Sequence, residues 1–312
     1  MKLHYAGTPG SGYGWGTCNA HLIEELGKRC ELTGPDGADV VFMPLADHSF
    51  NPATPARGKV NLAYAFFEFP LQPMAIVNAA KYDAVFCGST WCLDRMFDAG
   101  IGNGEVLIQG VDTGIFKPGE RKPDGQFRIF SGGKFEYRKG QDLVIAAFKV
   151  FHREHPGAHL VCSWFNPWPA LEIDLLNRMG APCPWDINPA QLTILPQLTH
   201  PMLAREMANT DCGLFPNRCE GGTNLVLMEY AATGGVVVAN ALTGHADVRD
   251  MIDVVIEAGE DEMKWARQSV EDIVRALESA SEGRGRVKKM CIPTWENAAK
   301  QILRKAEELL KV

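Results

Sequence analysis

The sequence has 312 residues, of which 46% are hydrophobic and 22% are charged. These values are typical of globular proteins and exclude a disordered chain, and the length is enough for two domains that each bury a core. No apolar run approaches the roughly 18 residues that a membrane-spanning helix needs, so we expect no transmembrane segment.

The net charge and the distribution of the cysteines indicate which partners and which cellular compartment to expect. The formal net charge is −7, and acidic residues outnumber basic ones over the first 116 positions, which argues against nucleic acid as a partner. The nine cysteines are scattered and include no Cys-x-x-Cys pair, which favours a reducing compartment over a disulfide framework. The first residues turn to glycine too soon for a signal peptide, so a cytoplasmic location is expected.

Short apolar runs alternate with helical stretches over residues 1–116, and this alternation predicts a parallel sheet with helices on both faces. Strands are predicted at residues 3–6, 40–43, 62–66, 84–87 and 106–108. A glycine-rich loop follows the first strand and includes Gly12 and Gly14. Such a loop lets a phosphate or a sugar approach the backbone, although the spacing of its glycines is not that of the dinucleotide fingerprint.

Glu68 stands among aromatic residues at the expected end of the third strand. Parallel sheets bind ligands at the carboxyl ends of their strands, which makes Glu68 a candidate site residue. The alternative is a loop glutamate whose aromatic neighbours belong to the core.

A charged segment that is rich in glycine and proline, residues 119–125, is predicted to link two domains. After it, strands are predicted at residues 127–130, 160–163, 193–195, 212–215 and 236–239. A helical stretch follows the first of these strands, and helical patterns dominate after Gly244. The same alternation therefore predicts a second domain with a parallel sheet.

Residues 216–235 combine the end of a buried strand, a two-glycine turn and the start of a helix. Thr223 or Asn224 can cap that helix, whose free N–H groups and positive dipole end make a site for an anion. Glu220 and Glu229 frame the site. They would repel a bare phosphate but suit a ligand with hydroxyls beside its phosphates, as in a nucleotide sugar. The alternative is an ordinary strand-to-helix turn with two solvated glutamates.

This stretch resembles the donor-sugar loop of family 4 glycosyltransferases (glycosyl transferases group 1), which carry a glutamate, a glycine-rich turn and a second glutamate on the next helix. Further runs that resemble this family are residues 110–118, 131–140 and 294–300. The family usually has seven residues between the two glutamates, whereas this chain has eight, and we assign the extra residue to the Gly-Gly-Thr-Asn turn.

The resemblance implies an α/β fold of the GT-B type, in which two Rossmann-like, doubly wound parallel-sheet domains face each other across a cleft. It places an acceptor-side domain at residues 1–116 and a nucleotide-sugar-binding domain at residues 117–293. It also implies that a C-terminal helix, at about residues 294–312, packs back on the first domain.

The resemblance assigns roles to charged residues on both sides of the site. Lys134 and Lys139 take the places where the family holds the donor diphosphate. The first place is usually arginine, which grips phosphate bidentately where lysine acts as a point charge. Glu220 is placed at the donor sugar and Glu229 at the ribose hydroxyls. The other positions expected around the donor, including the loop that holds the base, are Gly133, Leu198, Gly221, Gly222, Thr223, Asn224 and Leu225.

The implied activity is that of a retaining hexosyltransferase, which moves a sugar from a UDP-, GDP- or ADP-sugar to a hydroxyl group. The acceptor is expected to be a glycan, a lipid-linked sugar or another hydroxyl compound, and Glu68 is expected to orient it or to share its proton. No cofactor and no metal are expected, because the sequence has no Asp-x-Asp triplet of the kind that binds Mn²⁺ or Mg²⁺ in some other transferases. A sugar-nucleotide epimerase of the same fold and a non-catalytic partner subunit remain as alternatives.

Overall fold

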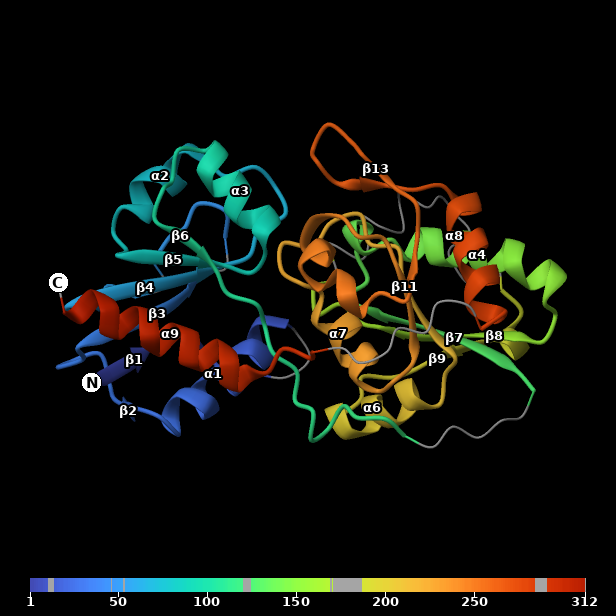
Figure 1. Ribbon diagram of the computed structural model, residues 1–312, viewed down its shortest axis with the longest axis horizontal. Coiled ribbons are helices and arrows are strands. Elements are labelled where there is room, and N and C mark those ends of the chain that lie inside the picture. The colour runs from blue at the N-terminus through green and yellow to red at the C-terminus, as the bar shows by residue number, and fades with distance from the viewer. Residues whose placement is uncertain are drawn as a thin grey trace. The chain divides into compact units, whose positions relative to one another are not determined.

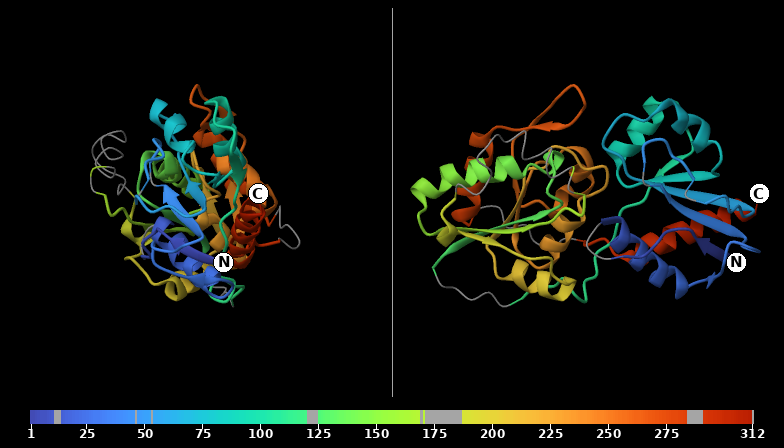
Figure 2. Two further views of the ribbon diagram at one scale, coloured as in Figure 1. Left: turned by 90° about the vertical axis from the view of Figure 1, so that its left-hand side faces the viewer. Right: turned by 180° about the vertical axis from the view of Figure 1, so that it is seen from behind.

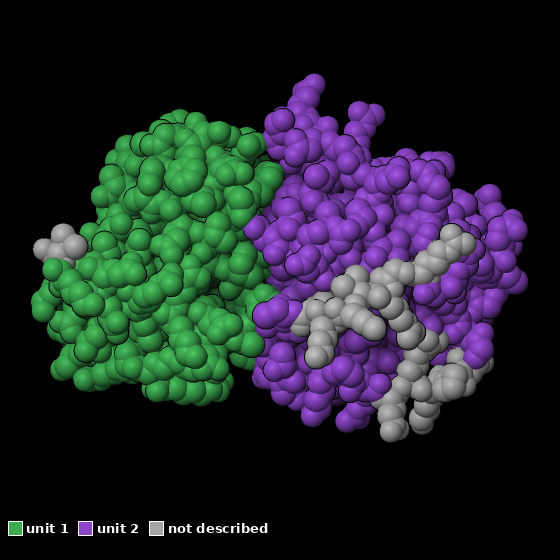
Figure 3. All heavy atoms as spheres, in the orientation of Figure 1, with its two compact units in different colours: residues 1–110, 221–223, 293–312 green, residues 111–220, 224–292 purple. Residues whose placement is uncertain are grey.

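The computed structural model describes residues 1–10, 14–45, 47–52, 54–119, 125–168, 170, 187–283 and 291–311. The chain forms two compact units, which Figure 3 colours separately. Unit 1 comprises residues 1–110, 221–223 and 293–312, and unit 2 comprises residues 111–220 and 224–292. The short segment 221–223 thus groups with unit 1, although residues on both sides of it belong to unit 2.

Unit 1 is built on a six-stranded sheet in the order β2-β1-β3-β4-β5-β6, and every pair of neighbouring strands is parallel (Figure 1). The strands are β1 (Lys2–Tyr5), β2 (Glu31–Leu32), β3 (Val40–Leu45), β4 (Val60–Ala65), β5 (Ala84–Cys87) and β6 (Gly104–Val106). All six residues of β3 are buried, as expected of a central strand with helices on both faces. The five predicted strands are confirmed with ends that move by up to two residues, and only the two-residue strand β2 was not predicted.

The helices of unit 1 are α1 (Gly14–Gly27), α2 (Pro73–Ala79), α3 (Thr90–Asp98) and α9 (Trp295–Leu310). Helices α2 and α3 cover the sheet face that includes Val41, Ala63 and Val85. These three residues and the buried hydrophobic residues of both helices belong to one core cluster. Helix α9 packs against α1 and β4 (Figures 1 and 2). Its residue Gln301 donates a hydrogen bond to the carbonyl of Val106 (2.7 Å). The last helix therefore completes the layer around the sheet of unit 1.

Unit 2 contains a second six-stranded parallel sheet, in the order β12-β11-β10-β7-β8-β9. Its strands are β7 (Phe127–Gly133), β8 (Ala158–Trp164), β9 (Leu192–Ile194), β10 (Cys212–Phe215), β11 (Val236–Ala239) and β12 (Val254–Val255). The short hairpin β13 (Gly259–Glu260) and β14 (Ala266–Arg267) lies outside this sheet. All five strands predicted for this half are confirmed, and the unpredicted ones are only two residues long.

The helices of unit 2 are α4 (Gln141–Glu154), α6 (His200–Ala208), α7 (Leu225–Ala232) and α8 (Val270–Ser281), with 3-10 segments at Tyr137–Lys139, Pro189–Gln191 and Thr243–Met251. Helices α4 and α8 share one core cluster with strands β7, β8, β10 and β11. On the other face α7 packs against β7, β10 and β11 (Figure 1), and the rings of Phe130 and Tyr230 stack there with their centroids 5.4 Å apart. Since β11, β10 and β7 are adjacent and parallel, the loops that follow them emerge at one edge of the sheet. No helix in the described part of the chain is long and apolar enough to cross a membrane.

Candidate functional site

The candidate site is formed by the loops that follow β7, β10 and β11 in unit 2. Gly140 lets the first two loops approach each other, because its φ of 73° is in the left-handed region and a Cβ there would lie 2.3 Å from the carbonyl oxygen of Pro216. The approach brings the 3-10 segment Tyr137–Lys139 alongside the residues that follow β10, and the backbone N–H of Arg218 donates to the carbonyl of Arg138 (2.7 Å). Two segments about 80 residues apart in sequence thereby form one site.

Glu220 lies at the centre of the site and is only 4% exposed. Its carboxylate accepts hydrogen bonds from Lys139 Nζ (2.5 Å), from Arg138 Nη1 (3.0 Å) and from the amide of Asn217. Burial by itself would raise the pKa of Glu220, but the charges of Lys139 and Arg138 outweigh that effect and lower the pKa to about 2. Glu220 is therefore ionised at neutral pH.

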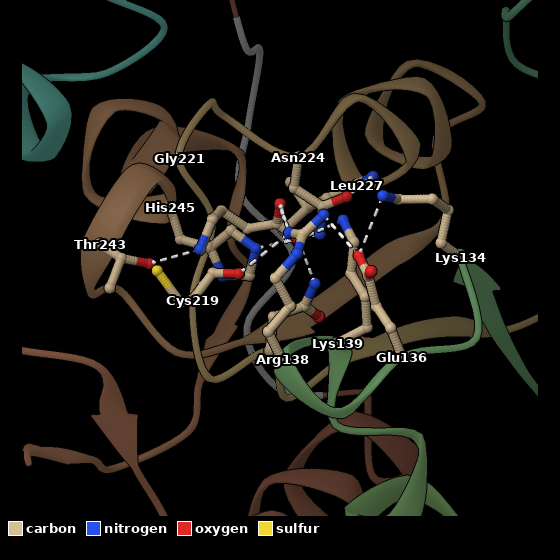
Figure 4. Close-up of polar contacts among 12 residues, drawn as sticks. Lys134, Glu136, Arg138, Lys139, Cys219, Gly221, Asn224, Leu227, Thr243 and His245 are labelled. Atoms are coloured by element: carbon tan, nitrogen blue, oxygen red, sulfur yellow. Dashed lines mark hydrogen bonds and ion pairs between the residues drawn. The ribbon is translucent and has the colours of Figure 1, made fainter. Parts of the chain in front are cut away.

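A second carboxylate, Glu136, lies beside the same cations (Figure 4). One of its oxygens is 2.6 Å from Arg138 Nη2 and 3.3 Å from Lys134 Nζ. Burial opposes ionisation of Glu136, but Arg138 and Lys134 lower its pKa on balance. The ammonium group of Lys134 also lies 5.0 Å from the centre of the Trp168 ring, within range of a cation–π interaction. Three cations and two carboxylates thus form one charged cluster, which we call the Lys139 cluster.

The helix that follows Glu220 begins beside this cluster. Asn224 has a φ of 57° and caps α7 by accepting a hydrogen bond from the backbone N–H of Leu227 (3.4 Å). Of the two caps considered from the sequence, Asn224 is the one that the structure shows, and Leu225 is the first residue of the helix. The free N–H groups at the start of α7 thereby lie in the same loop region as Glu220.

Glu229 lies further along α7 in a different environment. It is 5% exposed, and burial raises the pKa of its carboxyl from 4.5 to about 8. Within the described ranges, no hydrogen bond or ion pair reaches this side chain. The two glutamates of the same sequence stretch therefore have opposite pKa shifts, because only Glu220 has cations beside it.

The other predicted site residues lie in several places. Gly133 ends β7 with a φ of 122°, so it directly precedes Lys134. Leu198 is half-buried in the loop before α6. Glu68 and Gly14 belong to unit 1, as do Gly221, Gly222 and Thr223, whereas the Lys139 cluster belongs to unit 2. Gly12 lies outside the described residues.

The aromatic neighbours of Glu68 include both core and exposed side chains. Tyr64 and Phe67 are 1% and 3% exposed, so they belong to the core of unit 1, as the alternative interpretation expected. Phe69 is 50% exposed, and Glu68 itself is partly exposed. Glu68 remains accessible for the role that was predicted for it.

Sequence reasoning missed four residues that the structure places in or beside the cluster: Glu136, Arg138, Asn217 and His245. The first two stand inside the run 131–140 that resembles the family, so their charge was a usable signal. No signal pointed to His245, which is fully buried and hydrogen-bonded to Asn224. The described residues contain no group of three or more His, Cys, Asp and Glu side chains arranged to hold a metal ion.

Comparison with solved structures identifies the fold. No protein-family model matches the sequence, and the comparison with curated proteins finds no match. Sucrose-phosphate synthase from Thermosynechococcus elongatus superposes with a TM-score of 0.75 at 14% identity, over 100% of this chain and 99% of that chain. Anabaena HepE in complex with UDP-glucose gives 0.64 at 13% identity, over 99% of this chain and 100% of that chain.

A third similar structure is AviGT4, a glycosyltransferase involved in avilamycin A biosynthesis, with a TM-score of 0.63 at 17% identity over 100% of this chain and 98% of that chain. These full-length matches and the two parallel sheets show that the chain has the GT-B fold, an α/β architecture with two Rossmann-like domains. The fold predicted from the sequence is confirmed.

Proposed function

We propose that this protein is a glycosyltransferase that moves a hexosyl group from a nucleoside diphosphate sugar to an acceptor hydroxyl, with retention of configuration and without a metal ion. The Lys139 cluster beside the start of α7 is the observation that carries the proposal. The GT-B fold supports it, because similar structures include glycosyltransferases and a complex with UDP-glucose.

The cluster has the charge that a leaving diphosphate requires. Lys134, Arg138 and Lys139 exceed Glu136 and Glu220 by one positive charge, and the positive end of the α7 dipole adds to that field. Preorganised cations and N–H groups stabilise the charge that grows on a leaving group, since they need no reorganisation during the reaction. Lys134 and Lys139 are assigned this role, so that a bound metal ion is not required.

Glu220 is suited to hold the sugar rather than to transfer a proton. With a pKa of about 2 it carries no proton to donate at neutral pH. Its two oxygens offer about four acceptor positions, of which Lys139, Arg138 and Asn217 use three, so one remains for a sugar hydroxyl. In a retaining reaction the leaving phosphate can take the proton of the acceptor on the same face. Glu68, in unit 1, is assigned to the acceptor, where it orients the attacking hydroxyl.

Glu229 is assigned to the ribose of the donor. Its side chain is 5% exposed and has no hydrogen-bond partner among the described residues, and burial alone raises its pKa to about 8. A pair of neighbouring hydroxyls would donate two hydrogen bonds to the ionised form, and such charge-assisted bonds are worth more than neutral ones. Ligand binding would thus replace the missing partners of this side chain.

The proposal is tested by incubating the protein with labelled UDP-, GDP- and ADP-sugars and measuring the release of free sugar. We expect slow hydrolysis of one donor class without acceptor, and a large loss of that activity in Lys139→Ala. The control is Lys300→Ala, because Lys300 lies on the exposed surface of α9 and pairs only with Glu296 (2.8 Å) among the described residues.

Each alternative gives a different result in this assay. An epimerase would return the nucleotide sugar with one inverted centre and no free nucleoside diphosphate. A non-catalytic subunit would leave every donor intact, and that outcome would refute the proposal. Retention is read from the anomeric configuration of the first transfer product by NMR.

A further inference from the structure

A buried polar network supports the turn that leads from Glu220 into α7. The loop after β11 contributes three side chains to it, Asn240, Thr243 and His245, which are at most 6% exposed. Thr243 Oγ1 accepts from the backbone N–H of Glu220 (3.1 Å), and the backbone N–H of Gly244 donates to the carbonyl of Glu220 (3.0 Å). One loop therefore holds both peptide groups of the residue at the start of the turn.

The other end of the turn is held through Asn224. A φ of 57° is uncommon for a residue other than glycine and persists only where its surroundings hold it. Asn224 uses its side-chain oxygen for the N–H of Leu227, so its amide nitrogen must find an acceptor elsewhere. That acceptor is Nε2 of His245, at 3.0 Å (Figure 4).

The contacts of His245 determine its protonation state. Its Nδ1 lies 3.1 Å from the carbonyl of Asn240 and must donate, while its Nε2 must accept from Asn224. Only the neutral ring with its proton on Nδ1 satisfies both contacts. Burial also lowers the pKa of His245 to about 4, although the charge of Glu220 opposes that shift.

We infer that His245 is a positioning residue of the donor site: as the neutral Nδ1–H tautomer it holds Asn224 in the left-handed conformation that starts α7. This inference rests on the proposed function only for its effect on the donor. The chain has eight residues between Glu220 and Glu229, and a left-handed residue allows the extra one to be absorbed while α7 keeps its start beside the Lys139 cluster.

The loss of His245 would therefore affect the start of α7 and leave the rest of unit 2 in place. The buried amide of Asn224, 4% exposed, would lack an acceptor and would rotate, and the cap on Leu227 would be lost with it. The first N–H groups of α7 would move, whereas the strands behind them would keep their pairing. Binding of a diphosphate would weaken, because a small displacement of preorganised donors has a large effect.

A double-mutant cycle tests the inference on affinity for UDP, GDP and ADP, using whichever binds the wild type. We expect His245→Leu to weaken binding about tenfold or more. His245→Gln should restore most of it, because an amide can both accept from Asn224 and donate to Asn240. Asn224→Gly keeps the left-handed backbone without the contact, so adding His245→Leu to it should change affinity by less than about twofold. An equal effect in both backgrounds would overturn the inference.

Hydrogen exchange supplies a readout that needs no ligand. In His245→Leu the amide of Leu227 should exchange at least about tenfold faster, while the amide of Leu214 in β10 keeps its rate. A uniform acceleration of both amides would show that His245 serves only general stability. If the wild type binds no nucleoside diphosphate, the proposed function fails, while the exchange of Leu227 still decides the role of His245. If His245→Leu does not fold, His245→Gln and Asn224→Gly are compared in the same way: the glutamine must keep Leu227 protected and the glycine must lose that protection.

Discussion

Replacing Glu229 with glutamine should stabilise the protein, and the gain should grow as the pH rises from about 4.5 to about 8. The folded protein keeps a proton on Glu229 in this range, because burial raises the pKa from 4.5 to about 8. The unfolded chain has already released that proton. The unfolded state therefore binds fewer protons than the folded state, and the free energy of unfolding of the wild type falls as the pH increases.

The magnitude follows from the two pKa values. Each unit of difference corresponds to about 1.4 kcal/mol, so the penalty is near zero below pH 4.5, about 3 kcal/mol at pH 7 and about 5 kcal/mol above pH 8. Glutamine has nearly the same size and does not titrate, so it removes this pH dependence without opening a cavity. Wild type and variant should differ little at pH 4.5 and most at pH 8.

Urea unfolding at pH 4.5, 6, 7 and 8 measures the effect, with the difference between variant and wild type as the quantity of interest. Glu262→Gln removes a carboxylate from an exposed position and controls for the change in net charge. Parallel pH profiles for Glu229→Gln and wild type would refute the reasoning, because they would mean that Glu229 titrates equally in the folded and unfolded states.

Further predictions concern the Lys139 cluster and the donor. Lys139→Ala should reduce transition-state stabilisation, as measured by kcat/KM, by about 2–4 kcal/mol. An unchanged kcat/KM in a folded variant would refute the role of Lys139 at the diphosphate. Glu220→Gln should destabilise the protein by about 3–5 kcal/mol in urea unfolding, since it leaves Lys139 and Arg138 without their buried carboxylate, yet calorimetry should show no loss of nucleoside diphosphate affinity. Binding of that ligand at pH 7 should release protons as Glu229 ionises, which calorimetry in buffers of different ionisation enthalpy detects. The affinity should change by less than about tenfold, or 1.4 kcal/mol, between EDTA and Mg²⁺.

The layered fold was predictable because its central strands are buried on both faces. Runs such as Val40–Leu45 and Val236–Ala239 are continuously apolar, and helical stretches separate them, so the order of elements is readable from the chain. The strands that sequence reasoning missed, such as Glu31–Leu32 and Val254–Val255, have two residues each. Two residues are too few to show a period.

The sequence by itself determined the alternation of strands and helices and the turn before α7, and it limited the cap of that helix to Thr223 or Asn224, because each of these depends on neighbours in the chain. Only the tertiary structure decided which charges meet, since Lys139 and Glu220 are 81 residues apart. It also decided the difference between the two glutamates. Glu220 and Glu229 are the same residue type in one short stretch, and both are buried. Glu220 is ionised because two cations from a distant loop neutralise it, whereas Glu229 is buried with no cation beside it and keeps its proton.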